Sequence, residues 1–419
     1  MHITEAPSER HHKLDRPDTP GRSSTHDMPL PSDRLPWLDG LRLAAFALLV
    51  PYHVGMYYVS WDWHVKSPHT VQALEPFLLI TAPWRLGLLF FIGGVACQGL
   101  LARRGAWAAV RDRSSRLLWP LLFGMAVVVT PQAYFEVLTK APQQLPGDGG
   151  YLDFWQAYLA GGRYCRGNDC MRVPTWNHLW FLPYLWLYAL LGIALTAVWR
   201  APLRRRVLPG WAWMVLPVVP LALARLALFP RFGSTHDFTG DLYNHVQYFL
   251  LFAFGWASRS AWAQPLWPWT LRLRWPLLLL CIGCWLLLFA YFAIHPDAAP
   301  PLALLQSQRV LWAAYSWWAV LAACGWAQRA FRHESPRLRA ASAAVFCLYV
   351  LHQSVIVLLT QALRPLSLPW GLEAPLLVAL TMLIGAAAYV ALRGVPVLRV
   401  LVGIPGRPAA PGAVRSAAA

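Results

Sequence analysis

The amino-acid sequence predicts an all-α, polytopic membrane protein with about ten transmembrane helices and both termini in the cytoplasm. Of its 419 residues, 57% are hydrophobic and only 13% are charged, whereas a soluble domain carries about 25% charged residues. The apolar residues gather in runs of about 20, the length with which a helix spans the hydrocarbon core of a bilayer. The formal net charge of +17 comes from basic residues between these runs, so it does not predict a nucleic-acid-binding patch.

Ten apolar segments are long enough to be these helices, and their continuous hydrophobicity favours helices over transmembrane strands. The segments are 38–61, 77–101, 117–138, 178–199, 211–229, 246–262, 275–294, 310–327, 341–363 and 374–392. With the N-terminus inside, 25 of the 36 Lys and Arg residues fall in cytoplasmic segments and eight in outer loops, as the positive-inside rule requires. The sequence therefore predicts a multi-pass protein of the inner (cytoplasmic) membrane, not a cytosolic enzyme or a secreted scaffold.

The membrane domain is expected to cover residues 37–395. Residues 1–36 and 396–419 are rich in Pro with His or Ala, so we expect them to be disordered cytoplasmic tails. The first apolar run is long enough to remain as an anchor, which predicts no cleaved signal peptide. The longest outer loop holds Cys165 and Cys170, which could pair in an oxidising compartment or remain free thiols. No cysteine spacing indicates a metal site.

Arg42 and His53 are ionisable groups inside the first span, where such groups are costly and therefore candidates for function. Their separation of 11 residues corresponds to about 1100° of helix, close to three full turns, so both side chains lie on one side. They are roughly 16 Å apart along the axis, with Arg42 nearer the cytoplasm. This arrangement would suit a long anionic substrate with a reactive far end.

Further basic residues accompany this pair. Arg113 and Arg116 lie one turn apart where the third span leaves the cytoplasm; they are either positive-inside anchors or a bidentate phosphate site. Arg85, His178 and His352 lie in or at other spans, and together they would line an aqueous cavity. Carboxylates are nearly absent from the middle of the spans, which favours chemistry by histidine over ion-coupled transport.

At these residues the sequence resembles the integral-membrane acyltransferase family known as acyltransferase-3. The stretch Trp37-Leu38-Asp39-Gly40-Leu41-Arg42 followed by His53, and Arg113 with Arg116, match its signature of Arg, ten residues and His with a later Arg-x-x-Arg. The stretch 88–94 is similar to the family's second span, with Gly93 where serine is common. The segments 178–182 and 349–353 resemble the branch that contains a periplasmic glucan succinyltransferase. The resemblance covers nearly all of residues 35–395.

The resemblance implies a transferase that moves an acyl group, acetyl or succinyl, from cytoplasmic acyl-CoA to a hydroxyl of an extracytoplasmic carbohydrate or glycolipid. Arg113 and Arg116 would bind the nucleotide phosphates, and Arg42 would steer the carrier arm or a carbonyl. His53 would deprotonate the acceptor hydroxyl or carry the acyl group itself. Acyl-CoA is then a substrate, no cofactor is permanently bound, no metal or nucleic acid is involved, and the lipid bilayer surrounds the protein.

Two other classes stay open at this point. A transporter that exports a polar precursor or an acyl donor would also need a polar cavity, and a structural scaffold would need none. The sequence does not decide which acyl group and acceptor are used, whether transfer is direct or through acyl-histidine, or the oligomeric state.

Overall fold

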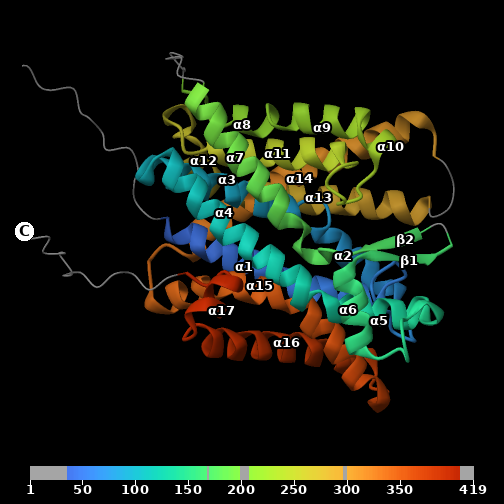
Figure 1. Cartoon of the computed structure of the whole chain (residues 1–419). Helices are drawn as coiled ribbons and strands as arrows, with labels where there is room; N and C mark the ends of the chain where they lie inside the picture. The colour runs from blue at the N-terminus through green and yellow to red at the C-terminus, as the bar shows by residue number, and fades with distance from the viewer. Residues whose placement is uncertain (1–34, 168, 199–206, 296–299, 406–419) are drawn as a thin grey trace, which may run out of the picture. The chain divides into compact units, whose positions relative to one another are not determined.

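The chain folds mainly into helices, as a computed structural model shows (Figure 1). It describes residues 35–167, 169–198, 207–295 and 300–405, so the two expected disordered tails lie largely outside the described residues. The longer helices are α1 (Pro36–Tyr58), α3 (Arg85–Arg104), α4 (Ala106–Phe123), α7 (Phe181–Val198), α11 (Leu242–Ala257), α13 (Arg274–Ile294), α14 (Leu302–Ala330), α15 (Pro336–Leu363) and α16 (Trp370–Leu392).

Shorter elements join these helices. They are α2 (Glu75–Thr81), α5 (Thr130–Lys140), α6 (Tyr151–Ala160), α8 (Ala212–Val215), α9 (Val218–Ala227), α10 (Phe229–Phe232), α12 (Leu266–Arg272) and α17 (Pro396–Leu401). Single turns of 3₁₀ helix are η1 (Gln72–Leu74), η3 (Pro142–Gln144), η4 (Asn177–Trp180), η5 (Ala261–Ala263) and η6 (Arg364–Leu366), and η2 (Gly124–Val128) is a π-helical turn. The strands are β1 (Gly162–Arg166) and β2 (Asp169–Val173).

Eight helical stretches in the described part of the chain are long and apolar enough to cross a membrane. They are Gln72–Arg104, Ala106–Lys140, Asn177–Val198, Ala212–Phe232, Arg274–Ile294, Leu302–Ala330, Pro336–Leu366 and Trp370–Leu392. The other two expected spans, α1 and α11, do not meet this standard, because α1 carries several polar residues and α11 has only 16 residues. Both still pack inside the bundle, α1 against α14 and α15, and α11 along α3. The structure therefore confirms a helical, polytopic membrane fold with eight helical stretches among the described residues that could span a membrane.

Two glycines let α3 and α11 approach each other until their backbones touch. A Cβ atom on Gly94 would lie 2.0 Å from the carbonyl oxygen of Phe252, and one on Gly255 would lie 2.0 Å from that of Phe91. Membrane helices commonly associate through such small residues, because lipid supplies no hydrophobic drive between helices. This crossing places the start of α3 beside the loop that precedes α11, and both contribute to the cavity described below.

The helix formed by α4 and α5 is interrupted by the π-turn η2, which leaves carbonyl groups free for other partners. The carbonyl of Ala126 accepts from Trp155 Nε1 at 2.8 Å, and that of Met125 accepts from the Tyr158 hydroxyl at 2.9 Å. The short helix α6 is therefore held against the bundle by its aromatic side chains. A hydrogen bond from Ser354 Oγ to the carbonyl of Val128 joins the same turn to α15.

The expected all-α polytopic class is confirmed, with one short exception. β1 and β2 form an antiparallel hairpin in the loop between α6 and η4, closed by a disulfide between Cys165 and Cys170. Five-residue strands are too short to show a clear alternation in the sequence. Residues 396–405, expected to belong to a disordered tail, include α17, and Val402 and Ile404 pack against Cys347 of α15. These two apolar side chains give the segment a surface to bury.

Candidate active site

A cavity of about 520 Å³ lies where several helices begin or end. Its walls come from the second half of α1, the start of α3, the segment before α7, the loop before α11, and the middle of α15. Its polar lining residues are Tyr52, His53, Asp62, His64, Arg85, Thr175, Asn177, His178, Thr235, His236, Tyr349, His352 and Gln353. Four residues chosen from the sequence as candidates therefore meet in one cavity, although they lie on four different segments.

Three imidazole rings form the deep wall of this cavity. His53 Nδ1 lies 3.1 Å from His352 Nε2, with ring centroids 5.0 Å apart. The ring of His178 meets that of His352 edge to face, with centroids 5.1 Å apart. His352 is only 2% exposed and His178 8%, whereas His53 is half-buried at the cavity surface. His53 is thus the member of the cluster that a ligand can reach.

The fully buried amide of Gln132 in α5 connects this cluster to its surroundings. Its Nε2 donates to Ser354 Oγ at 2.6 Å and lies 3.2 Å from His178 Nδ1. Its Oε1 accepts from Asn177 Nδ2 at 3.2 Å and from Gln353 Nε2 at 3.1 Å. Both ends of the amide are satisfied, as a buried polar group requires, so α5, η4 and α15 are fastened together behind the imidazoles.

Arg85 supplies a positive charge beside the imidazoles. It is 6% exposed, and its guanidinium carbon lies 3.3 Å from the ring centroid of Tyr52, a cation–π contact. Its Nη1 donates to Thr81 Oγ1 at 3.2 Å. Its Nε is buried without a hydrogen-bond partner among the described residues. A buried cation held by these neutral groups is suited to polarise or bind an electron-rich group of a ligand.

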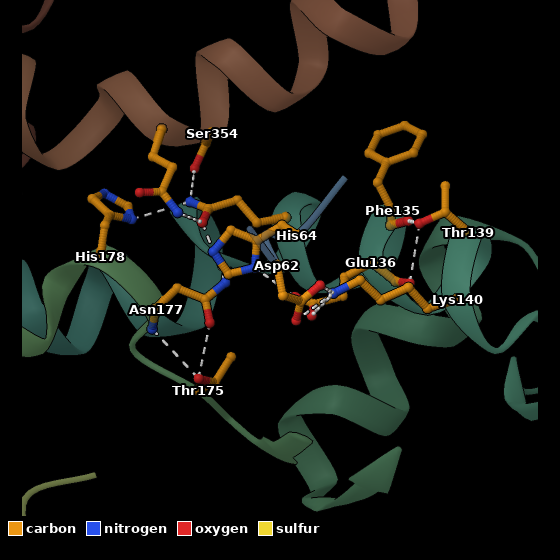
Figure 2. A network of polar contacts seen from close by, with 12 residues as sticks. Asp62, His64, Phe135, Glu136, Thr139, Lys140, Thr175, Asn177, His178 and Ser354 are labelled. Carbon is orange, nitrogen blue, oxygen red and sulfur yellow. Dashed lines mark hydrogen bonds and ion pairs between the residues drawn. The ribbon is translucent and has the colours of Figure 1, made fainter. Parts of the chain in front are cut away.

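The mouth of the cavity carries a network of charged residues that joins the loop after α1 to α5 (Figure 2). Glu136 Oε2 lies 2.5 Å from His64 Nδ1, and its Oε1 accepts from Lys140 Nζ at 3.1 Å. Lys140 also reaches Asp62 Oδ1 at 3.0 Å. In the same loop, Lys66 Nζ donates to the carbonyls of Met56, Val59 and Trp61, which caps the end of α1. The loop is therefore held in place at both ends.

The loop before α11 also lines the cavity and is organised by the fully buried carboxylate of Asp241. Asp241 accepts from the Tyr184 hydroxyl at 2.6 Å and from the backbone amides of Thr235 and His236 at 3.2 and 3.1 Å. The ring of His236 lies over Trp180, with centroids 4.0 Å apart. Burial lowers the pKa of His236 to about 4, so this cavity-lining imidazole is neutral near pH 7 and offers a hydrogen bond without a charge.

The remaining predicted site residues do not line the cavity. Arg42 Nη1 lies 3.3 Å from Asp39 Oδ1, which also accepts from Ser342 Oγ at the start of α15. Arg116 pairs with Asp112 at 3.2 Å, while Arg113 keeps a buried Nε without a hydrogen-bond partner in the described part of the chain.

Arg42, Arg113 and Arg116 belong to the end of the bundle opposite the cavity. Arg85 opens α3 at the cavity, and α3 runs roughly 30 Å to Arg104 before α4 returns. Arg113 and Arg116 follow near the middle of α4. The two groups of predicted residues are therefore separated along the axis of the bundle, as the spacing of Arg42 and His53 on α1 also implies.

Sequence reasoning missed His64, His236, Glu136 and Gln132. The cost of burying an ionisable group in a membrane marks only residues inside spans, and His64 and His236 lie in loops. Gln132 could have been found, because a neutral amide in an apolar segment is also costly without partners. The pairing of His64 with Glu136 has no signal in the sequence, since the two lie 72 residues apart.

Comparisons with known proteins match the chain to one family and to several relatives. The model of a family described as "Acyltransferase domain" matches residues 35–390. Proteins named "Glucans biosynthesis protein C" from Escherichia coli strain K12, O1:K1 / APEC and O139:H28 are 25% identical over 154 residues. These matches span 37% of this chain and 37% of each relative. No solved structure matches the chain.

Proposed function

The chain belongs to the acyltransferase family whose domain matches residues 35–390, and from this premise we propose that it moves an acyl group from cytoplasmic acyl-CoA to a hydroxyl of an extracytoplasmic carbohydrate or glycolipid. The observation that carries the proposal is the cavity in which His53 meets Arg85, His178 and His352. The name of the relatives supports a glucan as the acceptor.

His53 acts as the general base in this proposal. Its imidazole takes the proton of the acceptor hydroxyl while the hydroxyl oxygen attacks the carbonyl carbon of the thioester. The new C–O bond forms and the C–S bond breaks, and the imidazolium returns its proton to the leaving thiolate of CoA. Arg85, a buried cation in the same cavity, stabilises the negative charge that develops on the carbonyl oxygen.

The donor enters from the opposite end of the bundle. Arg113 and Arg116 bind its phosphates, and Arg42 steers the carrier arm toward His53, about 16 Å further along α1. The buried Nε of Arg113 without a partner in the described chain supports this role, because such a donor gains a hydrogen bond when an anion binds. The excess of Lys and Arg in the expected inner segments supports a cytoplasmic location of this end in the inner membrane.

Purified protein in detergent is expected to release free CoA from acetyl-CoA or succinyl-CoA and to esterify glucan oligosaccharides. Free thiol measures the first product, and mass spectrometry of the oligosaccharides identifies the ester and its position. A transporter has no chemical product in this assay, since detergent leaves no second compartment. Absence of both products with every donor, from protein that remains folded, would contradict the proposed function.

Arg113→Ala is expected to raise the KM for acyl-CoA by about 10- to 100-fold with a smaller change in kcat, because a charge-assisted hydrogen bond to phosphate is lost. Arg111→Ala is the matched control, as an exposed arginine two residues earlier on the same helix. Steady-state kinetics at varied acyl-CoA concentration measures both effects. Equal KM values for the two variants would exclude Arg113 from donor binding.

A further inference from the structure

His53 has no carboxylate partner to orient its ring in the described part of the chain. Its side-chain hydrogen-bond partner among the described residues is another imidazole, because Nδ1 of His53 lies 3.1 Å from Nε2 of His352. The two residues are 299 positions apart in sequence and come from α1 and α15. Since a general base must present the nitrogen that carries a lone pair, the question is which nitrogen of His53 holds the proton.

The backbone decides the tautomer of His352. Its Nδ1 lies 2.6 Å from the carbonyl oxygen of Tyr349, one turn earlier on α15. A carbonyl can only accept, so Nδ1 of His352 carries a hydrogen and donates it. A neutral imidazole has one donor and one acceptor nitrogen, which leaves Nε2 of His352 as an acceptor. The contact to His53 therefore needs the hydrogen on Nδ1 of His53.

The neighbouring ring of His178 does not compete for these nitrogens. Its Nε2 donates to the carbonyl of Val350 at 3.0 Å, and its Nδ1 accepts from Gln132 Nε2 at 3.2 Å. It meets His352 only through an edge-to-face contact, and Phe46 makes a second such contact with a centroid distance of 5.8 Å. Packing therefore holds the ring of His352 in place. Its two nitrogens form a hydrogen-bonded chain that runs from the carbonyl of Tyr349 to His53.

We propose that His352 is the positioning residue of the transfer reaction, and that with the Tyr349 carbonyl it replaces the carboxylate that orients a catalytic histidine in many hydrolases. This chain of hydrogen bonds fixes the hydrogen of His53 on Nδ1 and leaves the lone pair on Nε2. This inference rests on the proposed function only in taking His53 as the base. His352 touches no substrate; it acts through His53.

The arrangement also stabilises the charged form of the base. When His53 Nε2 takes the hydroxyl proton, the O–H bond breaks, an N–H bond forms, and both nitrogens of His53 carry hydrogen. The Nδ1–H bond to His352 then becomes charge-assisted and stronger. His352 keeps its own proton on Nδ1 throughout, and the proton on His53 Nε2 passes to the thiolate of CoA, so the chain is restored at the end of each turnover.

Two variants separate positioning from packing. His352→Leu fills the site but accepts no hydrogen bond, and is expected to lower kcat by about 10- to 100-fold without changing the KM for acyl-CoA. His352→Gln places an amide oxygen near the position of Nε2, and is expected to recover most of kcat. Wild-type kcat in the leucine variant, or equal loss in both variants when both remain folded, would overturn the proposal.

Nitrogen NMR of protein labelled with ¹⁵N-histidine gives a readout that needs no activity. The His53 signal, assigned by its absence in His53→Ala, is expected to show a protonated Nδ1 and an unprotonated Nε2 in the wild type and in His352→Gln. In His352→Leu the proton is expected to redistribute to Nε2. A proton on Nε2 in the wild type would overturn the proposal. The expected tautomer in a protein without any transfer activity would instead refute the proposed function and leave the hydrogen-bond chain intact.

Discussion

Replacing His53 by alanine is expected to lower the rate of acyl transfer by about 10²- to 10⁴-fold, the usual contribution of a general base. His53 is the half-buried, accessible member of the imidazole cluster and lines the cavity together with Arg85. Its removal leaves the hydrogen bonds of Gln132 and His178 in place, because neither residue bonds to it. The measurement is kcat for ester formation on glucan oligosaccharides, with the amount of protein in the membrane determined in parallel.

His69→Ala is the matched control for this variant. His69 lies in the loop after α1, on the same side of the bundle as the cavity, but it is exposed and does not line the cavity. It is expected to keep the wild-type rate. If His53→Ala retained more than a tenth of wild-type kcat at normal abundance, His53 would not be the base, and the carboxylate-bound His64 at the cavity mouth would be the next residue to replace.

The sequence could predict much of the deep half of the site, because burial in a membrane is costly for any ionisable group. That cost marks Arg85, His178 and His352 as candidates, and all three line the cavity with His53. The sequence could not predict how they are connected. The contact between His53 and His352 depends on the packing of α1 against α15, which no periodicity within either segment reveals.

The residues at the mouth of the cavity could not be predicted from the sequence for a different physical reason. These residues lie in loops, where a histidine or a carboxylate has little desolvation cost, so nothing in the sequence marks it as a functional candidate. Asp241 illustrates this, since it precedes an ordinary helix in the sequence but is fully buried and holds the backbone of Thr235 and His236. The same limit applies to the disulfide of Cys165 and Cys170, because their pairing is settled by the hairpin that brings their strands together.

The helix spans were predicted more accurately than their roles. Apolar length identifies α13 and α16, which keep many large apolar side chains exposed, as helices that face lipid do. It serves less well for α1 and α11, the two expected spans that fall below the length and apolarity standard. Helices enclosed by other helices can carry polar residues or be short, because neighbouring protein replaces lipid around them. Of these two helices, α1 is the one that carries His53.

Adding one methyl group at Gly94 is expected to produce a large loss of stability. A Cβ atom there would lie 2.0 Å from the Phe252 carbonyl oxygen and 2.8 Å from the Trp256 backbone nitrogen. Both are backbone atoms, so no side-chain rotation relieves the overlap and α3 must move away from α11. We expect Gly94→Ala to cost about 3 kcal/mol, the upper end of the range for overpacked sites.

The control is Gly283→Ala in α13, where nothing lies within 4 Å of the added atom. Alanine favours a helix over glycine by about 1 kcal/mol, so the two variants are expected to change stability in opposite directions. Thermal unfolding of the purified proteins in detergent measures the difference as a lower midpoint for Gly94→Ala and an unchanged or higher one for Gly283→Ala. Equal midpoints would show that α3 and α11 do not touch at this glycine. Because α3 begins at Arg85 and α11 follows the loop of His236, a separation of the two helices is also expected to widen the cavity and lower transfer activity in the Gly94 variant at temperatures where it remains folded.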